Sequence, residues 1–588
     1  MTDLPAEVDP NSWDPEEDNL PLVVACGAGE SVFVPPPVSF GTSAGDSEVV
    51  EHRNDSHLPA ATGRSAGWSG FLGWLSKEVV SVPAGHSLEN EMLPTLLRNA
   101  LPASGASLLY FAAQQILLMF VGHHLTPTEM AQYVVGISVF NVAGLSLALG
   151  FGGALDTLFS QAYGRLRVGE ETQTAVEMGV IAQRGLLLAT CLCFPIIIFF
   201  YAIGPLLSHF FGEIGAGAAV FLRYMPPYLL LVTLSSVFHK AFNAQGRTEM
   251  MMLAYLACVV VSFPLAYLLS PFGLPGCAAA LSGSTVVLFA VSVALGFFHP
   301  VSLLHRGAKW PLDPLTLQRR PIKEHCKIGF ASTVAVCAEW WAFEVLNLTV
   351  VRLGPIATDA FNIAYSITAC MWAIGAAGTS TAAGVATGNA IGAGEPMLAR
   401  AYARLSLVLV CCGWGVDIVL LAVFHRAIFF AYTSSPEVLQ QLQGIVVWMC
   451  LHHIGDATQF VFQGICRGIG RQAQVARICL VGLWLVALPT SLLFSRVLGL
   501  GLHGVFSGFA LGLLLVLVPV LFLYLRSIDW VAAVEESKSR AMRRPDNRDE
   551  FSMGDRPPNS TAIAHLATDT DAPSTQIRGV ASAEFDEL

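Results

Sequence analysis

Two acidic side chains stand in an apolar stretch where charge is costly to bury. The segment CAEWWAFEVLN, residues 337–347, carries Glu339 and Glu344 among aliphatic and aromatic residues. A charged side chain at the centre of a membrane helix costs about 2.5–3.5 kcal/mol on insertion scales, so such residues mark candidate functional sites. Five residues of α-helix leave the two side chains about 140° apart and about 7.5 Å apart along the axis. They cannot form a carboxylate dyad, so we expect one to line a cavity and the other to meet a neighbouring helix.

Aromatic residues share the helix faces of both acids. Trp340 precedes Glu344 by four residues, and Phe343 follows Glu339 by four, the spacing that places side chains side by side on a helix. An aromatic face beside a carboxylate suits an organic cation, because cation–π attraction adds to charge pairing. The alternative is that polar contacts between helices satisfy both acids.

A second polar group lies in LHHIGDATQ, residues 451–459. His452 and His453 stand four and three residues before Asp456, so each can lie near the acid. A metal site would need further ligands from another helix, and none stands out in the first half of the chain. We predict a histidine–carboxylate couple that handles protons, and no metal or other cofactor. Asp417 is a less favoured candidate, because a modest tilt of its helix would bring it to the membrane interface.

The composition places these residues in a membrane protein. Of 588 residues, 54% are hydrophobic and 13% are charged, whereas soluble domains are about 25% charged. No basic patch supports nucleic-acid binding. The 13 cysteines lack the spacing of metal or disulfide sites, which indicates buried apolar residues in a reducing environment.

Twelve apolar runs are long enough to cross a bilayer, which requires about 20 residues. Basic residues gather in the connections after the even-numbered runs, which predicts that both termini are cytosolic. The runs lie at about 101–121, 132–154, 178–200, 219–241, 250–270, 277–299, 327–351, 358–380, 402–424, 444–466, 475–497 and 502–525.

A weak internal repeat divides these runs into two halves. Gly164 and Gly392 stand in similar contexts, and Gly246 and Gly470 form a second such pair at nearly the same offset along the chain. Because each half has six helices, both halves have the same orientation in the membrane, and we expect a cavity between them. We therefore predict an all-α polytopic membrane protein with twelve transmembrane helices in two six-helix lobes, related by a pseudo-two-fold axis along the membrane normal. The predicted parts are a disordered acidic cytosolic tail (1–95), a first lobe (96–300), a cytosolic interlobe loop (301–326), a second lobe (327–526) and a disordered cytosolic tail (527–588).

Four stretches carry a resemblance to a known family. They are ALDTLFSQAYG (154–164), AEWWAFEVL (338–346), GNAIGAGEPMLARA (388–401) and FQGICRGIGRQ (462–472). Over roughly residues 95–530 the chain resembles the eukaryotic branch of the multidrug and toxic compound extrusion (MATE) family. The resemblance implies export of organic cations and drugs in exchange for protons or sodium, with proton coupling typical of eukaryotic members.

The resemblance also assigns site residues. The family's functional acids fall on Glu339, Glu344 and Asp456, its helix-10 histidine falls on His453, and a cavity asparagine of helix 2 falls on Asn141. The chain departs from the family where eukaryotic relatives often carry a glutamate in helix 8, because Ser366 lies there. The candidate residues for substrate and proton are therefore Glu339, Glu344, Asp456, His453, Asn141 and Trp340, with Asp417, Asp359 and Gln115 as less favoured additions.

These observations predict a transporter and not an enzyme. It would export organic cations, xenobiotics or metabolites by alternating access in exchange for H⁺, with Na⁺ the less favoured coupling ion. We expect a monomer in the plasma or vacuolar membrane that contacts small organic cations and membrane lipids, and no nucleic acid. Two alternatives stay open: a lipid or glycan-precursor flippase, which should have a basic cavity, and a polytopic membrane enzyme that uses His452, His453 and Asp456.

Overall fold

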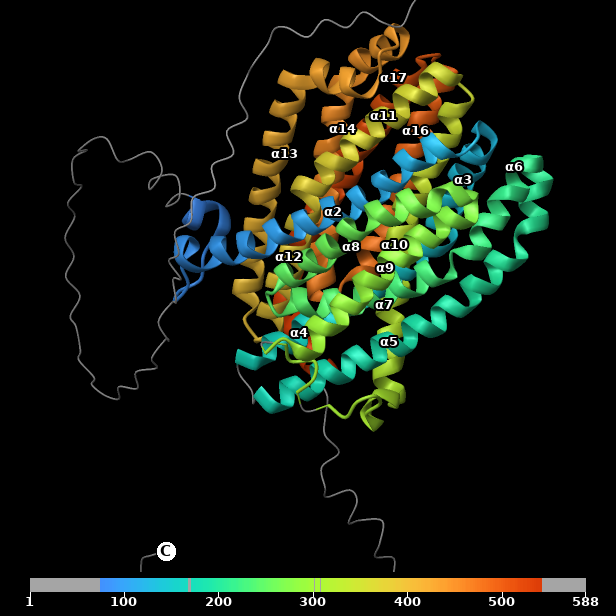
Figure 1. Ribbon diagram of the computed structural model, residues 1–588. Coiled ribbons are helices and arrows are strands. Elements are labelled where there is room, and N and C mark those ends of the chain that lie inside the picture. The colour runs from blue at the N-terminus through green and yellow to red at the C-terminus, as the bar shows by residue number, and fades with distance from the viewer. Residues whose placement is uncertain (1–74, 168–170, 301, 307, 542–588) are drawn as a thin grey trace, which may run out of the picture. The chain divides into compact units, whose positions relative to one another are not determined.

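The structure, a computed structural model, describes residues 75–541 except 168–170, 301 and 307. Within these ranges the regular elements are all helical (Figure 1). Eleven helical stretches there are long and apolar enough to cross a membrane. One of them, Thr248–Phe298, holds two helices, which a 3-10 turn, Ser270–Phe272, separates. The eleven stretches are therefore consistent with the predicted twelve helices.

The first half of the chain builds long helices joined by short helical turns. Gly212, at a φ of +57°, interrupts α6, and only Met225 separates α6 from α7. The elements are η1 (Leu75–Val80), η2 (Leu88–Met92), α2 (Leu93–His124), α3 (Pro127–Phe140), η3 (Asn141–Leu145), α4 (Ser146–Gly164), η4 (Arg165–Arg167), α5 (Glu171–Ala202), α6 (Gly204–Tyr224), α7 (Pro226–Ala244), α8 (Thr248–Leu269), η5 (Ser270–Phe272) and α9 (Gly273–Phe298).

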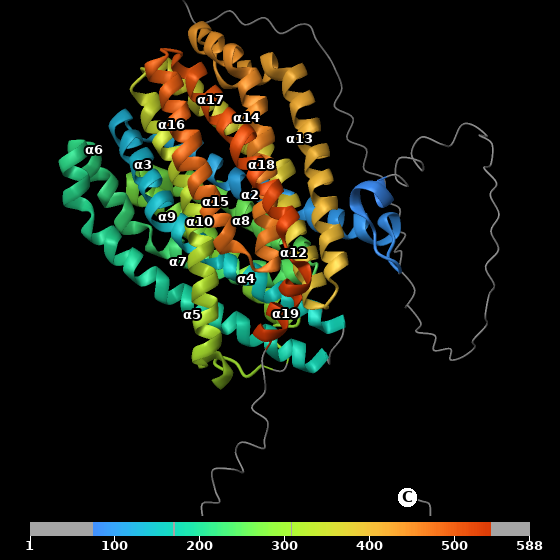
Figure 2. The same ribbon diagram turned by 180° about the vertical axis from the view of Figure 1, so that it is seen from behind.

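The second half follows a short connection and ends in a helix outside the predicted spans (Figure 2). Its elements are η6 (Pro314–Leu317), α10 (Arg319–Val351), α11 (Pro355–Met371), η7 (Trp372–Ala377), α12 (Gly378–Gly392), α13 (Pro396–Tyr432), α14 (Pro436–Ile469), α15 (Gln472–Leu480), η8 (Val481–Ala487), α16 (Leu488–Leu492), η9 (Leu493–Val497), α17 (Gly501–Gly512), η10 (Leu513–Leu517), α18 (Val518–Ser527) and α19 (Trp530–Arg540).

Local sequence signals set several helix ends. Thr126 and Glu129 form a capping box at the start of α3, with Pro127 at the first helical position. The Ser435 side chain caps α14, which ends at Gly470 with a φ of +81°. That left-handed conformation suits glycine, since a Cβ would be strained there.

The two halves repeat one packing arrangement, which confirms the predicted fold class. A π-helical turn, η3 or η7, precedes α4 in the first half and α12 in the second. Gly150 of α4 lies against the backbone of Thr333 in α10, and Gly378 of α12 lies against that of Ala100 in α2. These two glycines are separated by the same offset as the repeat found in the sequence. Each half therefore presents a glycine-bearing helix to the first helix of the other half, as a two-fold relation requires.

The predicted boundaries of the disordered tails and the loop need correction. Residues 75–95 form η1, η2 and the start of α2, and Val80 and Leu88 join the apolar core of the second half. Residues 530–540 form α19, whose Trp530 is buried. The first turns of α10 occupy the end of the predicted loop, from Arg319. These segments fold because their apolar residues pack against the helices of the bundle. Residues 1–74 and 542–588 lie outside the described part of the chain.

Candidate functional site

Glu339 and Glu344 meet different partners. Glu339 of α10 is buried, and its carboxylate accepts a hydrogen bond of 2.8 Å from the Nε2 of Gln463 in α14. Glu344 is half-buried and has Asn347, on the same helix, as its hydrogen-bonding neighbour. The separation expected from helix geometry therefore holds, and Glu339 is the acid that faces a second helix.

Asp456 and Tyr365 complete a group of acids in the second half. Asp456 of α14 is buried, accepts a hydrogen bond from the side chain of Gln459, and is close enough to Glu339 for electrostatic repulsion. Tyr365 of α11 interacts electrostatically with Glu344, Asp456 and Glu339, while 46% of its surface is exposed. We call Glu339, Glu344 and Asp456 the acid cluster. The sequence does not single out Tyr365, because nothing in α11 indicates an electrostatic interaction with acids on two other helices.

His453 pairs with Asp417 instead of Asp456. The Nε2 atom of His453 lies 3.0 Å from Oδ2 of Asp417 in α13, and both side chains are buried. His452 has other neighbours, and its ring packs against those of Phe343 and Phe509, with centroid distances of 5.8 and 5.6 Å. In the described part of the chain, no three His, Cys, Asp or Glu side chains are arranged to hold a metal ion.

The other predicted residues lie outside the acid cluster. Trp340 is half-buried and packs against the apolar core of the first half. Its neighbour Trp341, which the sequence analysis did not select, donates a hydrogen bond of 3.1 Å to the carbonyl of Val142 in η3. Gln115 and Asp359 are exposed and Asn141 is half-buried. None of these last three side chains hydrogen-bonds to the acid cluster within the described residues.

Neutral polar groups lie between several helices of the first half. The phenol of Tyr110 in α2 hydrogen-bonds to Gln114 and to Tyr228. Nε2 of His239 in α7 lies 2.9 Å from the hydroxyl of Ser292 in α9. The three carboxyl groups of the acid cluster lie in the second half, in line with the distribution of acids in the sequence.

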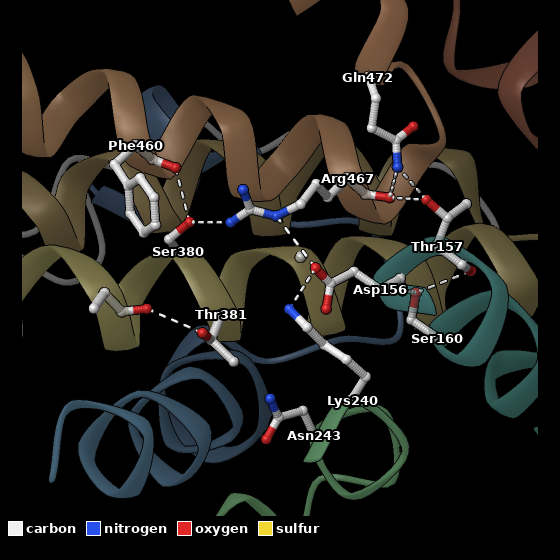
Figure 3. Close-up of polar contacts among 12 residues, drawn as sticks. Asp156, Thr157, Ser160, Lys240, Asn243, Ser380, Thr381, Phe460, Arg467 and Gln472 are labelled. Atoms are coloured by element: carbon white, nitrogen blue, oxygen red, sulfur yellow. Dashed lines mark hydrogen bonds and ion pairs between the residues drawn. The ribbon is translucent and has the colours of Figure 1, made fainter. Parts of the chain in front are cut away.

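A charged group joins the two halves at one end of the bundle (Figure 3). Asp156 of α4 lies 2.8 Å from Nζ of Lys240 and 3.4 Å from Nε of Arg467 in α14. The Arg467 guanidinium also donates a hydrogen bond to Ser380 and lies over the ring of Phe460, 5.3 Å from its centroid. Because Arg165 and Arg471 lie near the same helix ends, we call this the basic end of the bundle.

Backbone contacts strengthen the junction at the basic end. The Thr157 hydroxyl donates to the carbonyl of Arg467, and the Gln161 side chain donates to the carbonyl of Gly468. Two helices, α4 from the first half and α14 from the second, are thus tied to each other directly. A small crevice lies beside this junction and is lined by Gln463 and Arg467, among others. The Gln463 side chain therefore reaches from this crevice to the Glu339 carboxylate.

Known proteins match both halves of the chain. The model of the MatE family matches twice, over residues 102–268 and 331–493. The chain is 26% identical to Multidrug and toxin extrusion protein 1 of Danio rerio over 494 residues, which cover 82% of this chain and 80% of the relative. It is 30% identical to Protein DETOXIFICATION 16 of Arabidopsis thaliana over 427 residues, which cover 69% of this chain and 82% of the relative. The solved structure described as the eukaryotic MATE transporter AtDTX14 has the same fold, with a TM-score of 0.68, 23% identity, and coverage of 77% of this chain and 99% of that chain.

Proposed function

Because this chain belongs to the MatE family, whose members are membrane transporters and not enzymes, we propose that it exports organic cations in exchange for protons. The observation that carries the proposal is the acid cluster, in which two buried carboxyl groups on different helices stand close enough to repel each other. Two such groups repel each other when both are ionised, so a proton or a bound cation beside them is favoured, even though Arg467 also acts on Glu339.

The exchange follows from this competition. A carboxyl group in a poorly solvated site is stable when protonated, and it is stable when ionised if a cation binds beside it. Glu339 is the proposed exchanger, because Gln463 fixes its carboxylate while Asp456 adds negative charge nearby. The aromatic rings of Phe343 and Tyr365, 5.6 Å apart, supply a face for the organic part of the substrate.

The orientation follows from the positive-inside rule. In the proposed orientation, the basic end and both termini face the cytosol. We further propose that the protein works as a monomer in the plasma or vacuolar membrane. With the basic end closed by Asp156 and Arg467, the acid cluster exchanges its ligand with the opposite side. Opening toward the cytosol requires that this contact break. The acid cluster is then accessible alternately from the two sides of the membrane.

Purified protein in proteoliposomes tests the proposal. Uptake of radiolabelled tetraethylammonium is measured with an acidic lumen and an alkaline bath, and again with equal pH on both sides. This probe carries a permanent charge, so its own ionisation does not change with pH. We expect the pH gradient to drive accumulation, and a protonophore with potassium and valinomycin to abolish it.

Three control conditions separate the alternatives. A sodium gradient without a pH gradient should drive no uptake, and uptake under that condition would assign the coupling to Na⁺. Vesicles without protein, and vesicles that contain the Glu339→Gln variant, should stay empty. If the wild-type protein instead moves a fluorescent anionic phospholipid between leaflets and ignores tetraethylammonium, the flippase alternative replaces the proposal.

A further inference from the structure

We propose that Asp417 is a positioning residue for transport, which holds His453 ready to accept a proton outside the acid cluster. Asp417 lies on α13 and His453 on α14, with 3.0 Å between Oδ2 and Nε2. Their side chains are 5% and 1% exposed. The inference rests on the proposed function, since a second proton acceptor matters only where protons drive transport.

The hydrogen bond selects which ring nitrogen is free. A neutral histidine whose Nε2–H donates to a carboxylate keeps Nδ1 as an acceptor. Nδ1 of His453 is buried and has no hydrogen-bond partner among the described residues. Nδ1 is therefore the ring atom at which a proton can be added, and the doubly protonated ring is a cation. The carboxylate across the ring would then stabilise the cation through a charge-assisted bond.

Among the described residues around Asp417 and His453, a proton on His453 is the positive charge available to balance the carboxylate of Asp417. α13 packs against α11, η7, α12 and α14, and α14 packs in addition against α17 and η10. His503 is the titratable side chain of α17, and η10 has none. η7 and α12 contain no titratable side chain, and α11 contains no lysine or arginine. The titratable groups on the neighbouring stretches of α11, α13 and α14 are Asp359, Tyr365, Cys370, Cys411, Cys412, Cys450, His452 and Asp456. None of these is a permanent cation, so the negative charge of buried Asp417 is balanced when His453 takes up a proton.

Asp417 and His453 lie beside a contact between the two halves. A Cβ atom added to Gly375 of η7 would lie 3.0 Å from Oδ2 of Asp417, so the carboxylate rests against this π-helical turn. The hydroxyl of Ser104, from α2 of the first half, donates a hydrogen bond of 2.6 Å to the carbonyl of Ile374 in the same turn. A change of charge at Asp417 and His453 therefore occurs beside a contact between the halves.

The test measures tetraethylammonium exchange by the full-length protein in proteoliposomes at a series of pH values. Asp417→Asn keeps the size and an acceptor for the Nε2–H group but removes the charge, so His453 should take up its proton only at lower pH. The midpoint of the pH profile should move toward acid by about one pH unit or more, as expected for loss of an opposite charge within about 4–6 Å. Asp417→Glu should restore most of the wild-type profile. His453→Gln should remove the pH-dependent step that Asp417→Asn shifts, and the double variant should match His453→Gln.

His239→Gln is the matched control. His239 is also buried, but its Nε2 faces the Ser292 hydroxyl and not a carboxylate. This variant should keep the wild-type midpoint. A wild-type protein that ignores the pH gradient would contradict the proposed function. If transport by the wild-type protein is proton-driven, but Asp417→Asn and His453→Gln have the same pH profile as the wild type, the positioning role alone would be overturned.

A spectroscopic measurement decides the question if the variants do not fold. In wild-type protein with ¹⁵N-labelled histidine, one buried ring should change from the neutral Nε2–H form to the doubly protonated form over the pH range in which transport changes. If every buried ring stays neutral over that range, the proposal is wrong.

Discussion

Gly164 and Gly392 occupy equivalent places on the two sides of the crossing between α4 and α12. A Cβ atom added to Gly164 would collide with the carbonyl oxygen of Asn389, and one added to Gly392 would collide with that of Gln161. Gln161 and Asn389 are separated by the same offset along the chain as the two glycines. Each helix thus places its glycine against the backbone of the other, which makes the crossing self-complementary.

This crossing should not tolerate a methyl group on either side. Gly164→Ala and Gly392→Ala should each lower the thermal unfolding midpoint and slow transport, because the obstructing atoms are backbone and overpacking costs about 1–3 kcal/mol. The two effects should be similar in size, as the symmetry requires. Gly415→Ala in α13 is the control, since nothing among the described residues lies within 4 Å of the added atom. An effect of Gly415→Ala as large as the other two would show that the crossing is not special.

The contact between Asp156 and Arg467 should control opening of the basic end. Asp156→Asn and Arg467→Gln should each raise the reactivity of a cysteine placed at buried Ser160 toward a membrane-impermeant thiol reagent, because each removes one partner of the junction. The double variant should react little faster than either single variant. Lys538→Gln is the control, because the Lys538–Glu535 pair is exposed. Unchanged reactivity in both single variants would show that backbone contacts alone close this end.

Glu339 and Glu344 should respond unequally to neutralisation. Glu339→Gln should abolish uptake driven by a pH gradient at matched protein levels, because glutamine keeps the hydrogen bond to Gln463 but cannot exchange a proton. Glu344→Gln should slow transport while it remains proton-driven, since Glu344 is only half-buried. Transport at near wild-type rates, still proton-driven, in both variants would rule out carboxylate exchange on this helix.

The Tyr365 hydroxyl should contribute to cation binding at the acid cluster. Tyr365→Phe keeps the ring, which stacks on Phe361 at an interplanar angle of 13°, and removes only the group that interacts with the three acids. Because the hydroxyl dipole lies in the field of these acids, its loss should change the charge balance of the site, and the KM for tetraethylammonium should rise. Tyr432→Phe, at the exposed end of α13, is the control and should leave KM unchanged. An unchanged KM in Tyr365→Phe would remove this residue from the site.

The helix α19 should be required, whereas the residues beyond it should not. Arg540 of α19 lies 3.0 Å from Oε1 of Gln161 and also pairs with Glu324, while Glu536 pairs with Arg471 at 2.9 Å. A chain that ends after residue 541 should transport within a few-fold of the wild-type rate per molecule. A chain that ends after residue 528 should lose thermal stability and transport, because α19 covers the junction at the basic end. Equal activity of the two truncated chains would make α19 dispensable.

The sequence alone was sufficient to predict the class of protein, most of the helices and the repeat, although the predicted run 219–241 spans the break between α6 and α7. These features depend on runs of apolar residues, on the distribution of charge and on glycines at a nearly constant offset, all of which are local or periodic along the chain. The same patterns located the acids in the second half and predicted that Glu339 and Glu344 face apart. They failed at residues 75–95 and 530–540, which lack the length and apolar content of a span but fold against the bundle.

The partners of the polar side chains were decided only by tertiary structure. Along α14, His453 stands one turn from Asp456, yet it bonds to Asp417, 36 residues away on α13. Tyr365 gives no sign in the sequence that it interacts electrostatically with acids on α10 and α14. The rotation and tilt of each helix about its axis decide these contacts. Both are set by how side chains from several helices fit together, and the periodicity of a single helix does not determine them.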